Sequence, residues 1–147
     1  MLCDSCGLDY YVSPRPCNAL IITDNDNRIL LVKRAIEPSE GLWDLPGGFV
    51  NVEESVEESV VREAREELGV EVGHLKYLFS GCGRYVYKTL NYHTIGLVFA
   101  VKIASGTMKP QDDVAELKYF STNKIPWDTL AFPVLEQTLR KYIAERR

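Results

Sequence analysis

The stretch from Gly48 to Val70 reads GFVNVEESVEESVVREAREELGV. It contains three glutamates, Glu63, Glu66 and Glu67, at positions i, i+3 and i+4. In a helix these positions share one face, so three negative charges would repel one another there. A divalent cation that prefers oxygen ligands, such as Mg²⁺, would offset that repulsion.

The same stretch carries the signals of a complete helix over residues 55–68. Ser55 is a suitable N-cap, and Glu58 three residues later completes a capping box. Gly69 is suited to the left-handed conformation that ends many helices. Apolar side chains at helical spacing predict the buried face, which consists of Val56, Val60, Val61, Ala64 and Leu68. We expect the three glutamates to lie off this face.

The composition restricts the class of protein. A chain of 147 residues with 46% hydrophobic residues predicts one globular domain with a proper core. The net charge of −4 argues against nucleic acid as a partner. There is no apolar run of about 20 residues and no secretory signal at the N-terminus, so we expect no membrane association. Four cysteines in a chain this long do not indicate a disulfide framework, and reduced thiols predict a cytoplasmic protein.

The N-terminal segment contains a possible zinc knuckle. Cys3-Asp-Ser-Cys6-Gly places two thiolates in a turn that can grip one zinc ion, whereas a structural zinc site needs about four ligands. Three alternatives stay open: a zinc site completed within the chain, a metal-free remnant, or a site completed by a second chain. The other candidate ligands within the chain are Cys17, Cys82, His74 and His93.

The rest of the chain alternates apolar runs with loops. Residues 17–34 predict a hairpin, because the strand-length runs CNALIITD and RILLVKR flank a turn-rich Asp-Asn-Asp-Asn. Further strands and a final amphipathic helix are predicted at 70–82, 91–103, 115–121 and 132–145. This order indicates an α/β fold in which helices cover a mixed β-sheet.

Several loop residues have two open interpretations. Arg34 ends the second strand, where it could face an anionic substrate or be a solvated charge. Trp43 is a core anchor or a platform for a base, and we favour the core. Phe49, Tyr85 and Tyr87 could stack on a base or pack in the core.

Residues 48–70 resemble the Nudix box, Gly-x5-Glu-x7-Arg-Glu-U-x-Glu-Glu-x-Gly-U, at every fixed position. The matching residues are Gly48, Glu54, Arg62, Glu63, Glu66, Glu67 and Gly69, with Ala64 and Val70 at the two apolar positions. The chain is thus similar to the MutT-like Nudix hydrolases. The similarity implies a Nudix hydrolase domain over residues 17–147, folded as an α/β/α sandwich that contains a catalytic loop-helix-loop. Residues 1–16 resemble the second half of the zinc ribbon found in one subgroup.

The resemblance implies a hydrolase that cleaves the pyrophosphate linkage of a nucleoside diphosphate derivative with Mg²⁺ or Mn²⁺. Glu63, Glu66 and Glu67 match the metal-binding glutamates, and the Gly47 carbonyl is a further candidate ligand. Glu54 and Arg62 match the pair that ties the loop to the helix. A later acid also serves in some members; Glu116 is our first candidate for it, ahead of Asp113. For Glu116, a solvated strand-edge charge is an equal alternative.

The substrate is less clearly marked. The residues after the box lack the SQPWPFP-type stretch of the NAD(H)-cleaving branch, and they lack the proline common in ADP-ribose hydrolases. We expect an ADP-ribose-like, dinucleotide-like or (d)NTP-like small molecule, with a homodimer as an open option. The alternative function is a nucleotide-sensing Nudix module without catalysis, although such modules usually lose box glutamates that this chain retains.

Overall fold

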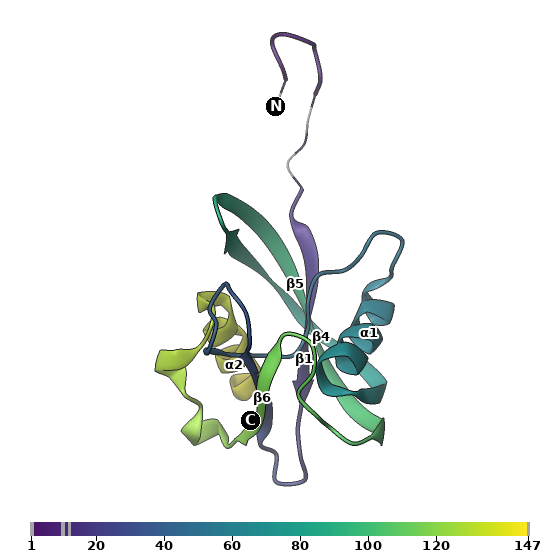
Figure 1. Cartoon of the computed structure of the whole chain (residues 1–147), viewed down its shortest axis with the longest axis vertical. Coiled ribbons are helices and arrows are strands. Elements are labelled where there is room, and N and C mark those ends of the chain that lie inside the picture. Colours follow the sequence, from purple (N-terminus) through teal and green to yellow (C-terminus); the bar gives the residue numbers. More distant parts are fainter. Residues whose placement is uncertain (1, 10, 12, 147) are drawn as a thin grey trace.

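The computed structural model describes residues 2–9, 11 and 13–146. These residues form six strands, two α-helices and two short 3₁₀ turns, which follow one another in the order shown in Figure 1. In order they are β1 (Arg15–Ile22), β2 (Ile29–Arg34), β3 (Trp43–Asp44), α1 (Val56–Leu68), β4 (Val70–Tyr87), β5 (Leu90–Gly106), β6 (Val114–Phe120), η1 (Thr122–Lys124), η2 (Trp127–Thr129) and α2 (Pro133–Glu145).

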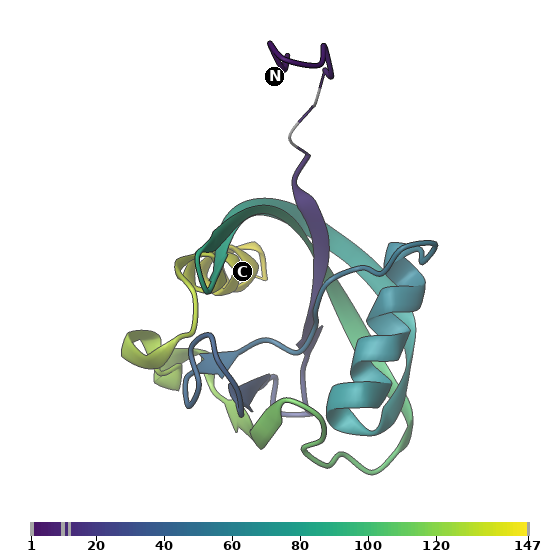
Figure 2. The same cartoon turned by 45° about the horizontal axis from the view of Figure 1, so that its top comes forward.

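The strands form two three-stranded sheets. In the first, β5 lies between β1, to which it is parallel, and β4, to which it is antiparallel. In the second, β2 lies between β3 and β6, both antiparallel to it. Helices α1 and α2 lie on opposite sides of these strands (Figure 2). The expected α/β fold with a mixed sheet and a C-terminal helix is therefore confirmed.

Strands β1 and β2 are buried on both faces, and this sets the layers. Successive side chains of a strand point to opposite faces. In β1, Leu20 and Ile22 join the core under α1, whereas Ile21 joins the core under α2. In β2, Leu30 packs toward α1 and Leu31 toward α2. Continuous apolar runs rather than alternating ones are what such doubly covered strands require.

The predicted hairpin over residues 17–34 is wrong, although both of its strands exist. β1 and β2 belong to different sheets, and next to the turn Thr23, which follows β1, makes an isolated bridge with Ile29. The apolar runs satisfied the strand pattern but carried no information on partners. β1 pairs instead with β5, which is distant in sequence, over Arg15–Ile22.

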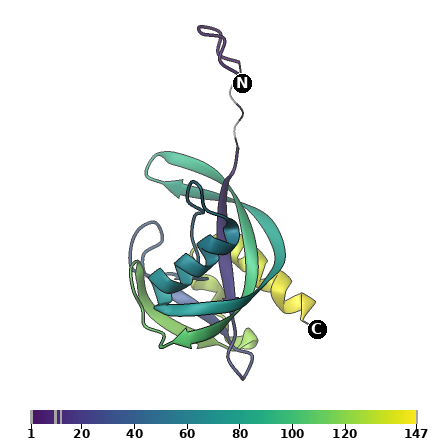
Figure 3. The same ribbon diagram turned by 90° about the vertical axis from the view of Figure 1, so that its right-hand side faces the viewer.

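The two longest strands extend beyond their expected limits. β4 and β5 stay paired from Val70–Gly106 to Tyr87–Leu90, so the region between the predicted strands is the end of one hairpin. This long curved ribbon arches over the side of the molecule (Figure 3). The expected core role of Trp43 is confirmed, since it is 9% exposed and meets the Phe120 ring edge-on at 5.0 Å.

The N-terminal segment lies apart from the body of the molecule (Figure 1). A tight turn forms there, because the Cys3 N–H donates to the Leu8 carbonyl and the Gly7 N–H to the Cys3 carbonyl, both at 2.8 Å. Cys3 and Cys6 are exposed. Hydrogen bonds from Ser5 and from the Cys6 backbone lower the pKa of the Cys3 thiol to about 6. Zinc binding by this turn stays a prediction.

Within the described part of the chain, no helix has the length and apolar character needed to cross a bilayer.

The packing of α1 can be tested through Leu68, which is fully buried at the end of that helix. We expect Leu68→Ala to lower the free energy of unfolding by about 2–5 kcal/mol, because the cavity left behind adds to the lost apolar burial. Val52→Ala, at a side chain that is 94% exposed, should change it by no more than about 0.5 kcal/mol. Urea unfolding measures both, and equal effects would contradict this packing.

Candidate active site

Helix α1 is fixed at both ends by its own sequence. The Ser55 hydroxyl accepts from the Glu58 N–H at 3.2 Å, and the Glu58 carboxylate accepts from the Ser55 N–H at 2.8 Å. Gly69 has a φ of 69° and closes the helix by donating to the Arg65 carbonyl at 3.0 Å. The expected cap, capping box and stop are confirmed. They fix the residues at which the helix begins and ends.

One guanidinium ties the preceding loop to this helix. Arg62 donates Nε to one oxygen of Glu54 at 2.7 Å and Nη2 to the other at 2.9 Å. Two parallel charge-assisted hydrogen bonds fix both distance and orientation. They hold the pKa of Glu54 at about 2, well below its ordinary value. Nη2 also donates to the Phe49 carbonyl at 3.0 Å, so the loop is attached at two points.

The other side of the guanidinium contacts two glutamates of the helix. Nη1 of Arg62 donates to Glu63 at 2.8 Å and to Glu66 at 2.9 Å. These two carboxylates therefore face Arg62 rather than a common point. Among the residues described, no three His, Cys, Asp or Glu side chains converge as a metal cluster.

Two of the three glutamates are buried, which corrects the expectation that all three lie off the buried face. Glu63 and Glu67 are 9% and 6% exposed, whereas the Glu66 side chain is 47% exposed. The cause is the loop before the helix, which folds back over α1. Its Gly47 N–H donates to Glu67 at 3.0 Å. The helical pattern shows which residues share a face, but it does not show what covers that face.

The buried acids are short of positive charge. Burial raises the pKa of Glu67 well above its ordinary value; the Gly47 N–H opposes this, and the charges of Glu63, Asp113 and Asp44 add to it. Burial also raises the pKa of Glu63, although Arg62 opposes the change. A nearby cation would favour the ionised forms of these acids.

The Gly47-Gly48 turn needs glycine at both positions. Gly47 has a φ of 135°, and a Cβ there would collide with the Asn18 carbonyl and approach the Asn18 Oδ1 to 2.9 Å. A Cβ on Gly48 would collide with the Glu63 carboxylate. The turn reaches this position because it pairs with β1: the Asn18 N–H donates to the Gly48 carbonyl at 2.9 Å.

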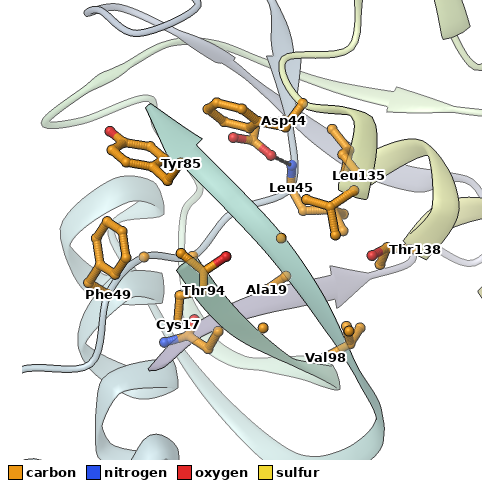
Figure 4. A pocket seen from close by; sticks show the side chains of 18 of the residues that line it. Cys17, Ala19, Asp44, Leu45, Phe49, Tyr85, Thr94, Val98, Leu135 and Thr138 are labelled. Atoms are coloured by element: carbon orange, nitrogen blue, oxygen red, sulfur yellow. Dashed lines mark hydrogen bonds between the residues drawn. The ribbon is translucent and has the colours of Figure 1, made fainter. Parts of the chain in front are cut away.

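The Gly47-Gly48 turn that covers these acids also lines a cavity of about 220 Å³, whose lining side chains are drawn in Figure 4. One wall is aromatic. The rings of Phe49 and Tyr85 meet edge-on at 5.3 Å, and Phe132 lies 5.7 Å from Tyr85. Below them are strand residues of β1, β4 and β5, among them Cys17, Ala19, Gly81, Gly83, Thr94, Gly96 and Val98.

A charged pair completes the lining. Arg34 Nη1 lies 3.4 Å from the Asp44 carboxylate, and its Nε donates to the Pro38 carbonyl at 2.6 Å. Burial raises the pKa of Asp44 to about 6, while Arg34 opposes the rise. The other Asp44 oxygen accepts from the Leu45 N–H at 2.8 Å, as Figure 4 shows. Arg34 is thus held at the cavity by groups that fix its direction.

The structure brings most of the expected substrate residues together. Arg34, Phe49 and Tyr85 line the cavity, and so does Gly47, the candidate metal ligand. Tyr87 is not part of that lining; it is 41% exposed near the tip of the β4–β5 hairpin.

The two candidates for the later acid lie in different surroundings. Glu116 lies on β6 opposite Lys33, its Oε2 is 3.4 Å from Lys33 Nζ, and its side chain is 47% exposed. This placement fits the strand-edge alternative. Asp113 lines the cavity and acts electrostatically on both buried glutamates. It is brought there because the loop before it is tied to the end of α1, where the Gln111 N–H donates to the Glu67 carbonyl at 3.0 Å.

Sequence reasoning did not identify three residues of the site. Asn18 is an amide inside an apolar strand, and that was a usable signal. Asp44 lies just before the Leu-Pro-Gly-Gly turn, so its position was a weaker one. Phe132 precedes α2 and reaches the cavity only through the tertiary fold.

The donors present fit a hard divalent cation. Carboxylate oxygens of Glu63, Glu66 and Glu67 are the ligands that Mg²⁺ and Mn²⁺ prefer. Arg62 donates to Glu63, but burial still raises the pKa of both Glu63 and Glu67, and a cation would oppose that rise. A cation would have to share Glu63 and Glu66 with that guanidinium.

The model of the NUDIX domain matches residues 14–143 of this chain. The chain belongs to the Nudix family. Its Nudix box is the loop and helix described above, with Arg62 at the centre.

Individual relatives agree with this membership. An ADP-ribose pyrophosphatase of Methanocaldococcus jannaschii is 40% identical over 107 residues, which cover 71% of this chain and 61% of the relative. The NAD-capped RNA hydrolase NudC of Pseudomonas aeruginosa is 32% identical over 147 residues, covering 99% of this chain and 50% of the relative. The crystal structure of a NUDIX hydrolase from Nitrosomonas europaea superposes with a TM-score of 0.76 at 29% identity, covering 99% of this chain and 78% of that one. The Nudix chain here therefore spans about half to three-fifths of the length of these two curated relatives.

Alanine substitutions in the glycine turn should separate stability from the site. Gly47→Ala should lower the thermal unfolding midpoint, because its methyl group meets the backbone of Asn18 and its φ is unfavourable for alanine. Gly48→Ala should leave the midpoint nearer that of the wild type, since a flexible carboxylate end can move, but it should weaken Mn²⁺ binding about 10-fold by displacing Glu63.

Gly73→Ala is the control, because a Cβ there makes only ordinary contact with Ala104 at 3.8 Å. Thermal unfolding and Mn²⁺ calorimetry measure the three variants. Unaltered Mn²⁺ binding by Gly48→Ala would contradict the assigned position of Glu63.

Proposed function

We propose that this Nudix domain hydrolyses the pyrophosphate linkage of a nucleoside diphosphate derivative, with Mg²⁺ or Mn²⁺. The observation that carries the proposal is one glycine turn, Gly47-Gly48, that contacts the two buried glutamates Glu63 and Glu67 and also lines the aromatic cavity. A pyrophosphate is strongly anionic, so it would approach these acids only together with a cation. A base would be accommodated by the aromatic wall.

Glu63, Glu66, Glu67 and the Gly47 carbonyl are the proposed ligands of the cation. When bound, such a cation neutralises phosphate charge and makes water a better nucleophile. Arg62 and Glu54 are positioning residues in this scheme, because they hold the loop and the helix in one arrangement. Asp113 replaces Glu116 as the proposed additional acid, since it lines the cavity and Glu116 does not. The three glutamate ligands and Asp113 are the candidate general bases.

The volume of the cavity indicates how much of the substrate it can hold. Its volume of about 220 Å³ is below the ~300–1,000 Å³ of typical ligand pockets, so it would take one part of the substrate. We propose that Phe49, Tyr85 and Phe132 hold the adenine base. Arg34 is placed to meet a phosphate or ribose oxygen. With the likeness to an ADP-ribose pyrophosphatase, this favours ADP-ribose-like compounds.

A capped RNA is a second candidate substrate, favoured by how the charge is distributed. Although the net charge is −4, residues 72–111 contain no Asp or Glu and five Lys or Arg: Lys76, Arg84, Lys88, Lys102 and Lys109. This segment includes the β4–β5 hairpin, which forms one wall of the cavity. The expectation that nucleic acid is excluded rested on net charge alone. The likeness to an NAD-capped RNA hydrolase gives the same candidate.

Other sequence-based expectations accompany this proposal without further support. A cytoplasmic location and a homodimer stay predictions, as does zinc at Cys3 and Cys6. A sensor without catalysis is disfavoured because all the box glutamates are retained.

A substrate panel tests the proposal. Wild-type protein with Mg²⁺ is incubated with ADP-ribose, NADH, diadenosine polyphosphates, CoA, (d)NTPs and NAD-capped RNA, and the products are separated. We expect Mg²⁺-dependent release of AMP from ADP-ribose. Glu67→Gln should lower kcat/KM at least about 100-fold, because losing several kcal/mol of transition-state stabilisation removes two or more powers of ten in rate.

Glu57→Gln, at an exposed glutamate on the same helix, is the matched control and should retain wild-type activity. Full activity of Glu67→Gln would refute the assigned site. If no compound turns over while one binds tightly without metal, the chain is a sensor. A preference for capped RNA that disappears at high salt would favour the second candidate.

A further inference from the structure

Asn18 is a buried amide in the middle of an apolar strand. It lies on β1, is 5% exposed and lines the cavity. Its Nδ2 donates to the Ser59 hydroxyl of α1 at 2.8 Å. Ser59 is completely buried, so this contact joins β1 to the face of α1 that is covered by the glycine turn.

The surroundings of Ser59 fix the orientation of this amide. The Ser59 oxygen also accepts from Arg62 Nη2 at 3.1 Å. The hydroxyl oxygen thus accepts from both Asn18 and Arg62. Because the Nδ2 of Asn18 is directed at Ser59, its Oδ1 points away from that hydroxyl.

That Oδ1 has no hydrogen-bond partner. Among the buried side-chain oxygens and nitrogens of residues 2–9, 11 and 13–146, it is the one atom without a hydrogen-bond partner. Such an atom is destabilising unless a water, a ligand or an ion satisfies it. It lies against Gly47, where a Cβ would come within 2.9 Å of it.

The chemistry of this position selects the occupant. An amide oxygen only accepts, so phosphate oxygens would be repelled there. The neighbouring Gly47 N–H is already used by Glu67, and Gly48 packs on the Glu63 carboxylate. The surroundings are thus rich in oxygen acceptors and poor in donors. A hydrated divalent cation satisfies such a set.

We propose that Asn18 is a positioning residue for the divalent cation. Its Oδ1 supplies an oxygen to the cation or to its hydration shell, and its Nδ2 braces Ser59 and Arg62. This inference rests on the cation of the proposed function and adds a ligand from β1, outside the Nudix box. It also explains why an amide is placed in an otherwise apolar strand.

The first test uses wild-type protein and needs no activity. The side-chain amide signals of Asn18 are identified in a ¹⁵N–¹H spectrum by their loss in Asn18→Asp, and MgCl₂ is then added. We expect these signals to shift, with the same midpoint as Mg²⁺ binding measured by calorimetry. Signals that stay in place at saturating Mg²⁺ would overturn the proposal.

The second test separates the two ends of the amide by Mn²⁺ calorimetry. Asn18→Ala should weaken Mn²⁺ binding about 10-fold or more. Asn18→Asp keeps oxygen acceptors but loses the N–H donor, and it should bind Mn²⁺ at least as tightly as the wild type. Asn123→Ala, at an exposed asparagine of η1, is the control and should be unchanged.

The outcomes distinguish this inference from the proposed function. If wild-type protein binds neither Mg²⁺ nor Mn²⁺, both are wrong. If the wild type binds Mn²⁺ and Asn18→Ala binds it equally well, only the role of Asn18 is wrong. Equal weakening in Asn18→Ala and Asn18→Asp would also overturn it, because the acceptor would then not be the group that matters. If Asn18→Ala does not fold, the wild-type spectrum decides.

Discussion

The bidentate ion pair between Arg62 and Glu54 is the interaction on which the site depends. It closes the loop between β3 and α1 onto the helix, and that closure is what buries Glu63 and Glu67. The same guanidinium then offsets part of the charge that burial concentrates. Because one residue both closes the loop and pairs with Glu63 and Glu66, the backbone of the loop and these carboxylates are positioned together.

The sequence predicted the local structure of this region well, since the information is local. Capping residues, the stop at Gly69 and the apolar stripe lie within one segment, and the structure has each of them. The resemblance to the Nudix box also indicated the link between Arg62 and Glu54. The longer strands and the final helix were found for the same reason, because their apolar patterns are continuous, whereas the two-residue β3 was not predicted.

What the sequence could not provide depends on contacts between distant segments. β1 and β2 are apolar on both faces, so their pattern did not reveal that they join different sheets. Burial of the glutamates depends on the covering loop, and Asp113 reaches the acids through the contact of Gln111 with the end of α1. The amide of Asn18 needs Ser59 and Gly47, which lie about 40 and 30 residues further along the chain. In each case the deciding neighbour is remote in sequence.

A double-mutant cycle in urea tests the central claim, that one pair ties the loop to the helix. The variants are Arg62→Gln, Glu54→Gln and the double variant. If Arg62 and Glu54 act through each other, the double variant should unfold near the same urea midpoint as the less stable single variant. If the two decreases in midpoint instead add, the residues act independently and the account of this site is wrong.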